Sequence, residues 1–253
     1  MQTLADQKIL VTGGNSGLGL GLVEALVERR ARVTVLARDP AHLAATRERL
    51  GVDTIAGDIA DPDLPMAVLE RLRPDVVVLN AGSQPPLAPI HEQKWEDFDE
   101  VWNVDVKAGL HWIQAALRLP LAPGSRVLVG SSGAAVNGSP LSGGYAGAKR
   151  MLWLMAHYAN DAAGRLGHDI RFQVLVPQQV VGETARGREV AEAYARRLGV
   201  SAEGFLARFG KPMPPRQFGE HVVAILTDPR HAAGTAFGLK GDHGIASLDD
   251  VAA

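Results

Sequence analysis

The chain has 253 residues, of which 46% are hydrophobic and 21% charged, and this is the composition of an ordinary globular protein rather than a disordered or fibrous one. Its 26 basic and 28 acidic residues give a formal net charge of -2 without a long run of either sign, so neither nucleic acid nor a membrane surface is an expected partner. The absence of cysteine excludes disulfides and thiolate ligands, and the eight histidines lack paired-ligand spacing, so no metal site is expected.

The expected location is the cytoplasm. No apolar run reaches the roughly 20 residues of a membrane span. The N-terminal residues also lack the basic segment and apolar stretch of a signal peptide.

Five short apolar runs predict buried strands, at residues 8–12 (KILVT), 32–37 (RVTVLA), 75–80 (DVVVLN), 125–130 (SRVLVG) and 171–176 (RFQVLV). Segments with helical spacing separate them, as in the leucines at 18, 22 and 26. Strand and helix in alternation predict one α/β domain over residues 1–253, with a doubly wound parallel sheet covered by helices on both faces. Residues 178–216 interrupt this pattern as a long insertion, which we expect to form a lid over a substrate pocket, although a purely structural excursion is the alternative.

The first predicted strand runs directly into GGNSGLG and then into a helix. Glycines at such a turn let the backbone approach a ligand, and the helix N-terminus offers free N–H groups to a pyrophosphate. The sequence therefore predicts a dinucleotide cradle around Gly13, Gly17 and Gly19. A P-loop is excluded because no Lys-Ser or Lys-Thr follows the glycines, and a plain glycine-rich turn is the remaining alternative.

The second predicted strand ends in Ala37 and is followed by Arg38. A carboxylate at this place would bind the ribose 2′-hydroxyl of NAD, whereas a cation suits the 2′-phosphate of NADP. NADP(H) is therefore favoured over NAD(H) as the cofactor. The alternative is that Arg38 is only a solvated side chain.

Tyr145 and Lys149 are four residues apart in a segment with helical character, so both side chains project from one face of the helix. An ammonium beside a phenol favours the phenolate form, which suits a residue that gives and takes a proton. The alternative is a packed ring next to a solvated charge.

These motifs together resemble the short-chain dehydrogenase/reductase family over nearly the whole chain. TGGNSGLG matches the family's TGxxxGxG, LNAG at 79–82 its NAG motif, YAGAK its YxxxK, and Ser132 lies thirteen residues before the tyrosine. The resemblance implies a Rossmann fold with about seven strands and a catalytic tetrad of Asn103, Ser132, Tyr145 and Lys149. The implied cofactor-binding residues are Gly13, Asn15, Ser16, Gly17, Leu18, Gly19, Arg38, Asp58, Ile59, Asn80, Ala81, Gly82, Tyr145, Lys149, Pro177, Gln178 and Val180.

One loop departs from the family pattern. After the strand at 171–176 the family has Pro-Gly and then V-x-T, whereas here Pro177 is followed by two glutamines and Val180. A glutamine beside the nicotinamide requires either a shifted backbone or an amide aimed at a ligand, so Gln178 joins Ser132 and Tyr145 as an expected substrate contact. A solvent-facing Gln178 is the alternative.

The resemblance implies an enzyme that interconverts a carbonyl (ketone or aldehyde) and an alcohol by hydride transfer, with Tyr145 as general acid/base. The alternative function is a catalytically silent NAD(P)-binding sensor or structural protein of the same fold. The expected partners are a small-molecule carbonyl or alcohol substrate and further copies of the chain, in a homodimer or homotetramer as is usual in the family.

Overall fold

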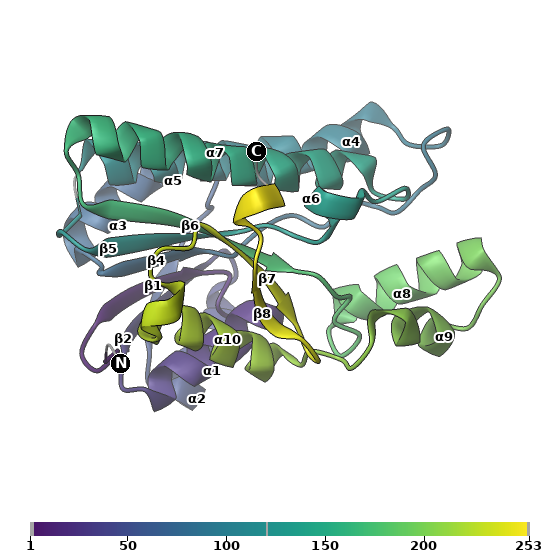
Figure 1. Cartoon of the computed structure of the whole chain (residues 1–253), viewed down its shortest axis with the longest axis horizontal. Helices are drawn as coiled ribbons and strands as arrows, with labels where there is room; N and C mark the ends of the chain where they lie inside the picture. Colours follow the sequence, from purple (N-terminus) through teal and green to yellow (C-terminus); the bar gives the residue numbers. More distant parts are fainter. Residues whose placement is uncertain (1–2, 120, 252–253) are drawn as a thin grey trace.

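A computed structural model of the protein describes residues 3–119 and 121–251. Within this part of the chain, eight strands form one sheet in the order β3-β2-β1-β4-β5-β6-β7-β8 (Figure 1). Neighbouring strands are parallel except for β7 and β8. The strands are β1 Lys8–Thr12, β2 Arg32–Ala37, β3 Asp53–Ala56, β4 Val76–Leu79, β5 Ser125–Gly130, β6 Ile170–Pro177, β7 Ala236–Lys240 and β8 Gly244–Ser247.

Helices connect the parallel strands and cover both faces of the sheet. They are α1 Gly17–Glu28, α2 Pro40–Leu50, α3 Leu64–Leu72, α4 Trp95–Val101, α5 Lys107–Arg118, α6 Ala134–Asn137, α7 Gly143–Leu166, α8 Ala185–Leu198, α9 Ala202–Leu206 and α10 Pro215–Thr227. A π-helical segment, Trp102–Val106, joins α4 to α5. Short 3-10 turns occupy Ala207–Phe209, Pro229–His231 and Asp249–Val251.

The strands are apolar on both faces because each face is buried under a helical layer. Along β1, Leu10 belongs to the core under α3, α5 and α7, whereas Ile9 and Val11 belong to the core under α1, α2 and α10. The predicted doubly wound α/β architecture is confirmed. The crossing of α1 and α10 is close enough that a Cβ on Gly21 would lie 2.2 Å from the backbone of Pro215.

The sheet has eight strands where the sequence predicted about seven. The additional strand is β8, which follows a turn at Gly244 with a φ of +68° and pairs antiparallel with β7. Left-handed backbone of this kind favours glycine and allows the chain to reverse within a few residues. This short edge strand was not expected because half of it is exposed, so it carries little apolar pattern.

Residues 178–216 hold α8 and α9, which extend beyond the end of the sheet in Figure 1. The two helices share a small apolar cluster of their own around Ala191, Ala195 and Phe205. Buried Gln179 fastens the base of the segment: its amide nitrogen donates to the carbonyls of Phe209 and Lys211, and its oxygen accepts from the backbone N–H of Gly241 at 2.6 Å. Among residues 3–119 and 121–251, no helix is both long enough and apolar enough to cross a lipid bilayer.

Candidate active site

The glycine-rich turn lies between the carboxyl end of β1 and the start of α1. Gly13 has a φ of +67°, and a Cβ on Gly19 would stand 2.2 Å from the Gly13 carbonyl oxygen, so the turn closes only because both residues are glycine. Ser16 is the N-cap of α1 but its side chain makes no capping hydrogen bond. The first N–H groups of α1 therefore remain available to an anion.

Residues after β4 brace this turn from the neighbouring strand. Thr12 Oγ1 accepts hydrogen bonds from the backbone N–H groups of Asn80 (3.0 Å) and Ala81 (3.1 Å). The Asn80 side chain donates back to the carbonyls of Thr12 and Gly13, at 3.3 and 3.4 Å. Asn80 and Ala81 thus lie against the glycine-rich turn, and Asn15 and Leu18 are half-buried within it.

Arg38 and Asp39 follow β2 at the same edge of the sheet. The Asp39 carboxylate is the N-cap of α2 and accepts from the N–H groups of Ala41 (2.8 Å) and His42 (3.2 Å). These hydrogen bonds lower the pKa of Asp39. Arg38 is exposed, and no hydrogen bond or ion pair of its guanidinium occurs within the described residues. Within the described residues the Arg38 guanidinium is thus unengaged, whereas the neighbouring Asp39 carboxylate is occupied.

Asp58 and Ile59 follow β3. Asp58 is exposed, and one of its carboxylate oxygens accepts from the N–H of Ala60 at 3.0 Å. Ile59 is buried, and its carbonyl accepts from the indole of Trp112 at 3.2 Å. Asp58 does not cap α3, because that helix begins at Leu64 and has Asp63 as its N-cap.

Tyr145 and Lys149 lie one turn apart near the start of α7. The Lys149 ammonium is 5.5 Å from the centre of the Tyr145 ring, and its side chain is only 8% exposed. Ser131 Oγ, at the end of β5, donates to the Lys149 carbonyl at 2.8 Å and thereby ties this helix to the sheet. Burial acts to lower the pKa of Lys149, but the charges of Asp105 and Tyr145 oppose it, and the resulting pKa is raised.

The partner of Lys149 is Asp105 rather than Asn103. The Asp105 carboxylate is fully buried, with Oδ2 at 2.9 Å from Lys149 Nζ, and its Oδ1 accepts from the Ser83 N–H at 2.7 Å. Asn103, two residues earlier in the same π-helical segment, is exposed. The membership of Asn103 in the tetrad stays a prediction, whereas the carboxylate that contacts Lys149 is that of Asp105.

A sequence signal for Asp105 did exist. Val101, Asp105, Ala108 and Trp112 are spaced as one face of a helix, and all four are buried. A carboxylate within such an apolar stripe requires a buried partner. Gly82, the last residue of the NAG motif, lies against this carboxylate, since a Cβ built on it would be 2.6 Å from Oδ2.

Ser132 follows β5 and is half-buried. Its hydroxyl oxygen accepts from the N–H of Ala134 at 3.2 Å, which leaves the hydroxyl hydrogen free to donate to a ligand. The next residue, Gly133, donates its N–H to the Pro177 carbonyl at 2.8 Å, so the loops after β5 and β6 lie side by side.

The two glutamines after Pro177 have different surroundings. Gln178 donates its backbone N–H to the Leu239 carbonyl at 3.0 Å, and its side-chain amide lies against Gly238 of β7. Val180 packs with the apolar cluster of α8 and α9. Gln179, which the sequence did not single out as a site residue, is the buried one and holds the base of residues 178–216.

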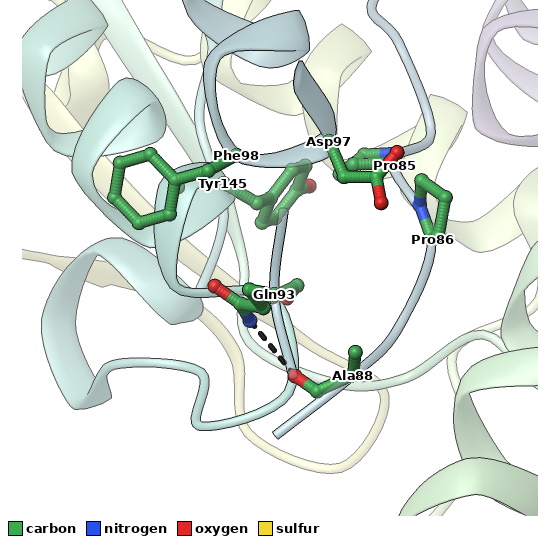
Figure 2. Close-up of a pocket in the computed structure, with 9 residues that line it drawn as sticks. Pro85, Pro86, Ala88, Gln93, Asp97, Phe98 and Tyr145 are labelled. Atoms are coloured by element: carbon green, nitrogen blue, oxygen red, sulfur yellow. Dashed lines mark hydrogen bonds between the residues drawn. The ribbon is translucent and has the colours of Figure 1, made fainter. Parts of the chain in front are cut away.

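A small pocket, partly open to solvent, adjoins Tyr145 (Figure 2). Its walls come from Pro85 and Pro86 after β4, from α4 and from the first turn of α7. Figure 2 shows the Tyr145 ring between Phe98 on one side and Asp97 with the two prolines on the other. Arg186 of α8 donates to the Pro85 carbonyl at 2.5 Å, so the 178–216 segment contacts one wall of this pocket.

Comparisons with known proteins agree with this arrangement. The sequence model of the short chain dehydrogenase family matches residues 7–194. The chain is 29% identical to the oxidoreductase asL5 of Sarocladium schorii over 98% of this chain and 99% of that protein. It is 32% identical to a cis-2,3-dihydrobiphenyl-2,3-diol dehydrogenase of Rhodococcus globerulus over 73% of this chain and 69% of that protein. It is also 32% identical to human L-xylulose reductase, over 51% of this chain and 54% of that protein.

The matched region runs from the start of β1 into α8 and so includes the glycine-rich turn, the NAG segment and the Tyr145–Lys149 pair. Members of this family use NAD(P) as the cofactor for oxidation and reduction of small molecules. The chain is therefore an enzyme of the short-chain dehydrogenase/reductase family.

Proposed function

We propose that the protein is an NADP(H)-dependent oxidoreductase that interconverts a carbonyl and an alcohol, with Tyr145 as the general acid/base. The observation that carries this proposal is the buried Lys149 ammonium, which lies 5.5 Å from the ring of Tyr145, a residue that lines a pocket. Buried lysines are rare unless they are paired, and one placed beside a phenol favours proton transfer by that phenol.

The residues present fit a dinucleotide. A Cβ on Gly13 would collide with Ala81 and one on Gly19 with the Gly13 carbonyl, so the turn needs glycine at both places, and the uncapped N-terminus of α1 suits a pyrophosphate. Arg38 would meet a 2′-phosphate, and Lys149 the nicotinamide ribose. When bound, the nicotinamide supplies or accepts the hydride.

The chain's own residues then provide binding and proton transfer. Ser132 donates a hydrogen bond to the substrate oxygen, which orients the carbonyl and stabilises the developing negative charge. Tyr145 donates its proton to that oxygen as it becomes an alkoxide, and Lys149 stabilises the phenolate that remains. In alcohol oxidation the same groups act in the opposite sense.

NADPH consumption with a panel of ketones and aldehydes tests this proposal. Tyr145→Phe keeps the ring but removes the transferable proton, so turnover falls by roughly 10²–10⁴-fold. Tyr158→Phe is the matched control, because Tyr158 is exposed on the same helix. Equal turnover of Tyr145→Phe and the unmodified enzyme on every accepted substrate would reject the role of Tyr145.

Two further features of the molecule belong to this proposal. Residues 178–216 act as the lid of the pocket, which the contact of Arg186 with Pro85 supports. The enzyme works in the cytoplasm as a homodimer or homotetramer, and the exposed Trp95, Trp102 and Leu110 on α4, the π-helical segment and α5 give an apolar face for such an interface. Light scattering of the purified protein measures the assembly directly.

A further inference from the structure

We propose that Asp105 sets the pH range of the reaction by balancing the charge of Lys149, so that Tyr145 retains its proton to higher pH and remains competent to reduce a carbonyl. Asp105 is thus a positioning residue that acts through Lys149. This inference rests on the proposed role of Tyr145 as the proton donor. It concerns Asp105, a carboxylate that the family resemblance did not include in the tetrad.

The geometry makes Asp105 an internal counter-ion. Its carboxylate is fully buried, lies 2.9 Å from Lys149 Nζ and is anchored by the Ser83 N–H at 2.7 Å. Gly82 leaves just enough space for it, since any Cβ there would strike the carboxylate. An ion pair enclosed in this way is held in one arrangement, and it is screened far less than a pair at the surface.

The charge balance around Tyr145 decides the direction of the effect. With a neutral residue at 105, the Tyr145–Lys149 pair carries one net positive charge, which favours loss of the first proton. With the Asp105 carboxylate the site is neutral, so losing a proton leaves a net negative charge and requires higher pH. Carbonyl reduction consumes that proton, whereas alcohol oxidation needs it to be absent.

The other groups that face this pair do not alter the balance to the same degree. From α4, Asp97 lines the pocket beside Tyr145 but is half-buried and open to solvent. From α5, Lys107 is exposed. From β5 and the loop after it, only uncharged groups approach, namely the Gly130 carbonyl at 3.5 Å from Lys149 Nζ and the serine hydroxyls.

The test is Asp105→Asn, which keeps the shape of the side chain and removes its charge. With an effective dielectric constant of about 20 and a separation of up to about 8 Å, one unit charge changes a neighbouring ionisation by roughly 1–2 pH units. We expect the alkaline limb of kcat/KM for carbonyl reduction to move down by that amount. Asp105→Glu, which retains the charge, should recover the original limb.

A second measurement does not depend on turnover. The chain has three tyrosines, so the difference in near-ultraviolet tyrosinate absorbance between each protein and its Tyr145→Phe derivative isolates Tyr145. In the Asp105→Asn background this difference should develop at lower pH, without substrate or cofactor. If no carbonyl is turned over, the proposed function fails, and this titration still decides the inference about Asp105.

Glu96→Gln is the control, because it removes the same charge from an exposed position on α4 and should leave both curves in place. Asp105→Ser provides a second neutral variant that can still accept from the Ser83 N–H if the asparagine variant does not fold. The proposal is overturned if the kcat/KM profile and the tyrosinate titration of a folded neutral variant stay unchanged or move to higher pH. A fall in kcat alone does not support it, because a purely structural role of Asp105 would lower activity without shifting either curve.

Discussion

Arg38 offers the sharpest test of the cofactor proposal. Replacing it by leucine removes the exposed guanidinium after β2 while leaving the Asp39 cap of α2 intact. Hydrogen bonds to charged groups contribute about 1.5–3 kcal/mol, and because Arg38 is exposed we take the lower end. A loss of about 1.5–2 kcal/mol corresponds to roughly 10–30-fold weaker binding of NADPH. Binding of NADH, which has no 2′-phosphate, should change little.

Fluorescence titration of the protein with each reduced cofactor measures both affinities. Arg47→Leu is the matched control, since Arg47 is an equally exposed arginine in the last turn of α2, far along the helix from the edge that carries Arg38. If Arg38→Leu weakens NADH and NADPH equally, or weakens neither, the phosphate-binding role of Arg38 is wrong.

Three further outcomes follow from the fold. Gly21→Ala forces a methyl group against the Pro215 backbone and should lower the free energy of unfolding by about 1–3 kcal/mol, measured by thermal unfolding. Gly164→Ala, in open space on α7, should raise the free energy of unfolding by about 0.5–1 kcal/mol. Equal effects of the two substitutions would contradict the close crossing of α1 and α10. Gln179→Ala removes the amide that binds the Phe209 and Lys211 carbonyls and should speed limited proteolysis within residues 178–216, while Gln178→Ala should not. For Asp249, burial acts to raise the pKa, but hydrogen bonds from Thr235, Ala236 and Ser247 hold it below the usual 3.8. The Asp249 carboxylate therefore stabilises the folded protein above that value, and this stabilisation is lost as the pH falls through the lowered pKa. The difference in Tm between the unmodified protein and Asp249→Asn should accordingly disappear in acid.

The cofactor end of the site could be expected from the sequence because its signals are local. A strand followed by closely spaced glycines and a helix fixes the turn at Gly13 and Gly19 through backbone geometry alone. The separation of four between Tyr145 and Lys149 likewise fixes their common face within a single helix. Neither inference needs knowledge of how distant segments meet.

Asp105 shows where residue spacing was insufficient. The motif assignment selected Asn103 by residue type, but which side chain faces Lys149 depends on the phase of a helix that passes through a π-helical turn at Trp102–Val106. The spacing of the buried residues Val101, Asp105 and Ala108 indicated which face of the helix is turned inward. The role of Asp105 in this stripe became evident only with α7 packed against it, because a buried carboxylate needs a partner and α7 carries that partner, Lys149.

The sequence by itself determined the alternation of buried strands and helices, the dinucleotide turn and the tyrosine–lysine pair, because each depends on periodicity or on residues close together in the chain. Only the tertiary structure decided that Asp105 pairs with Lys149, that Gln179 rather than Gln178 is buried, and that β8 extends the sheet. Those features arise from contacts between segments that are distant in the chain, and burial, charge pairing and strand register are settled only when such segments meet.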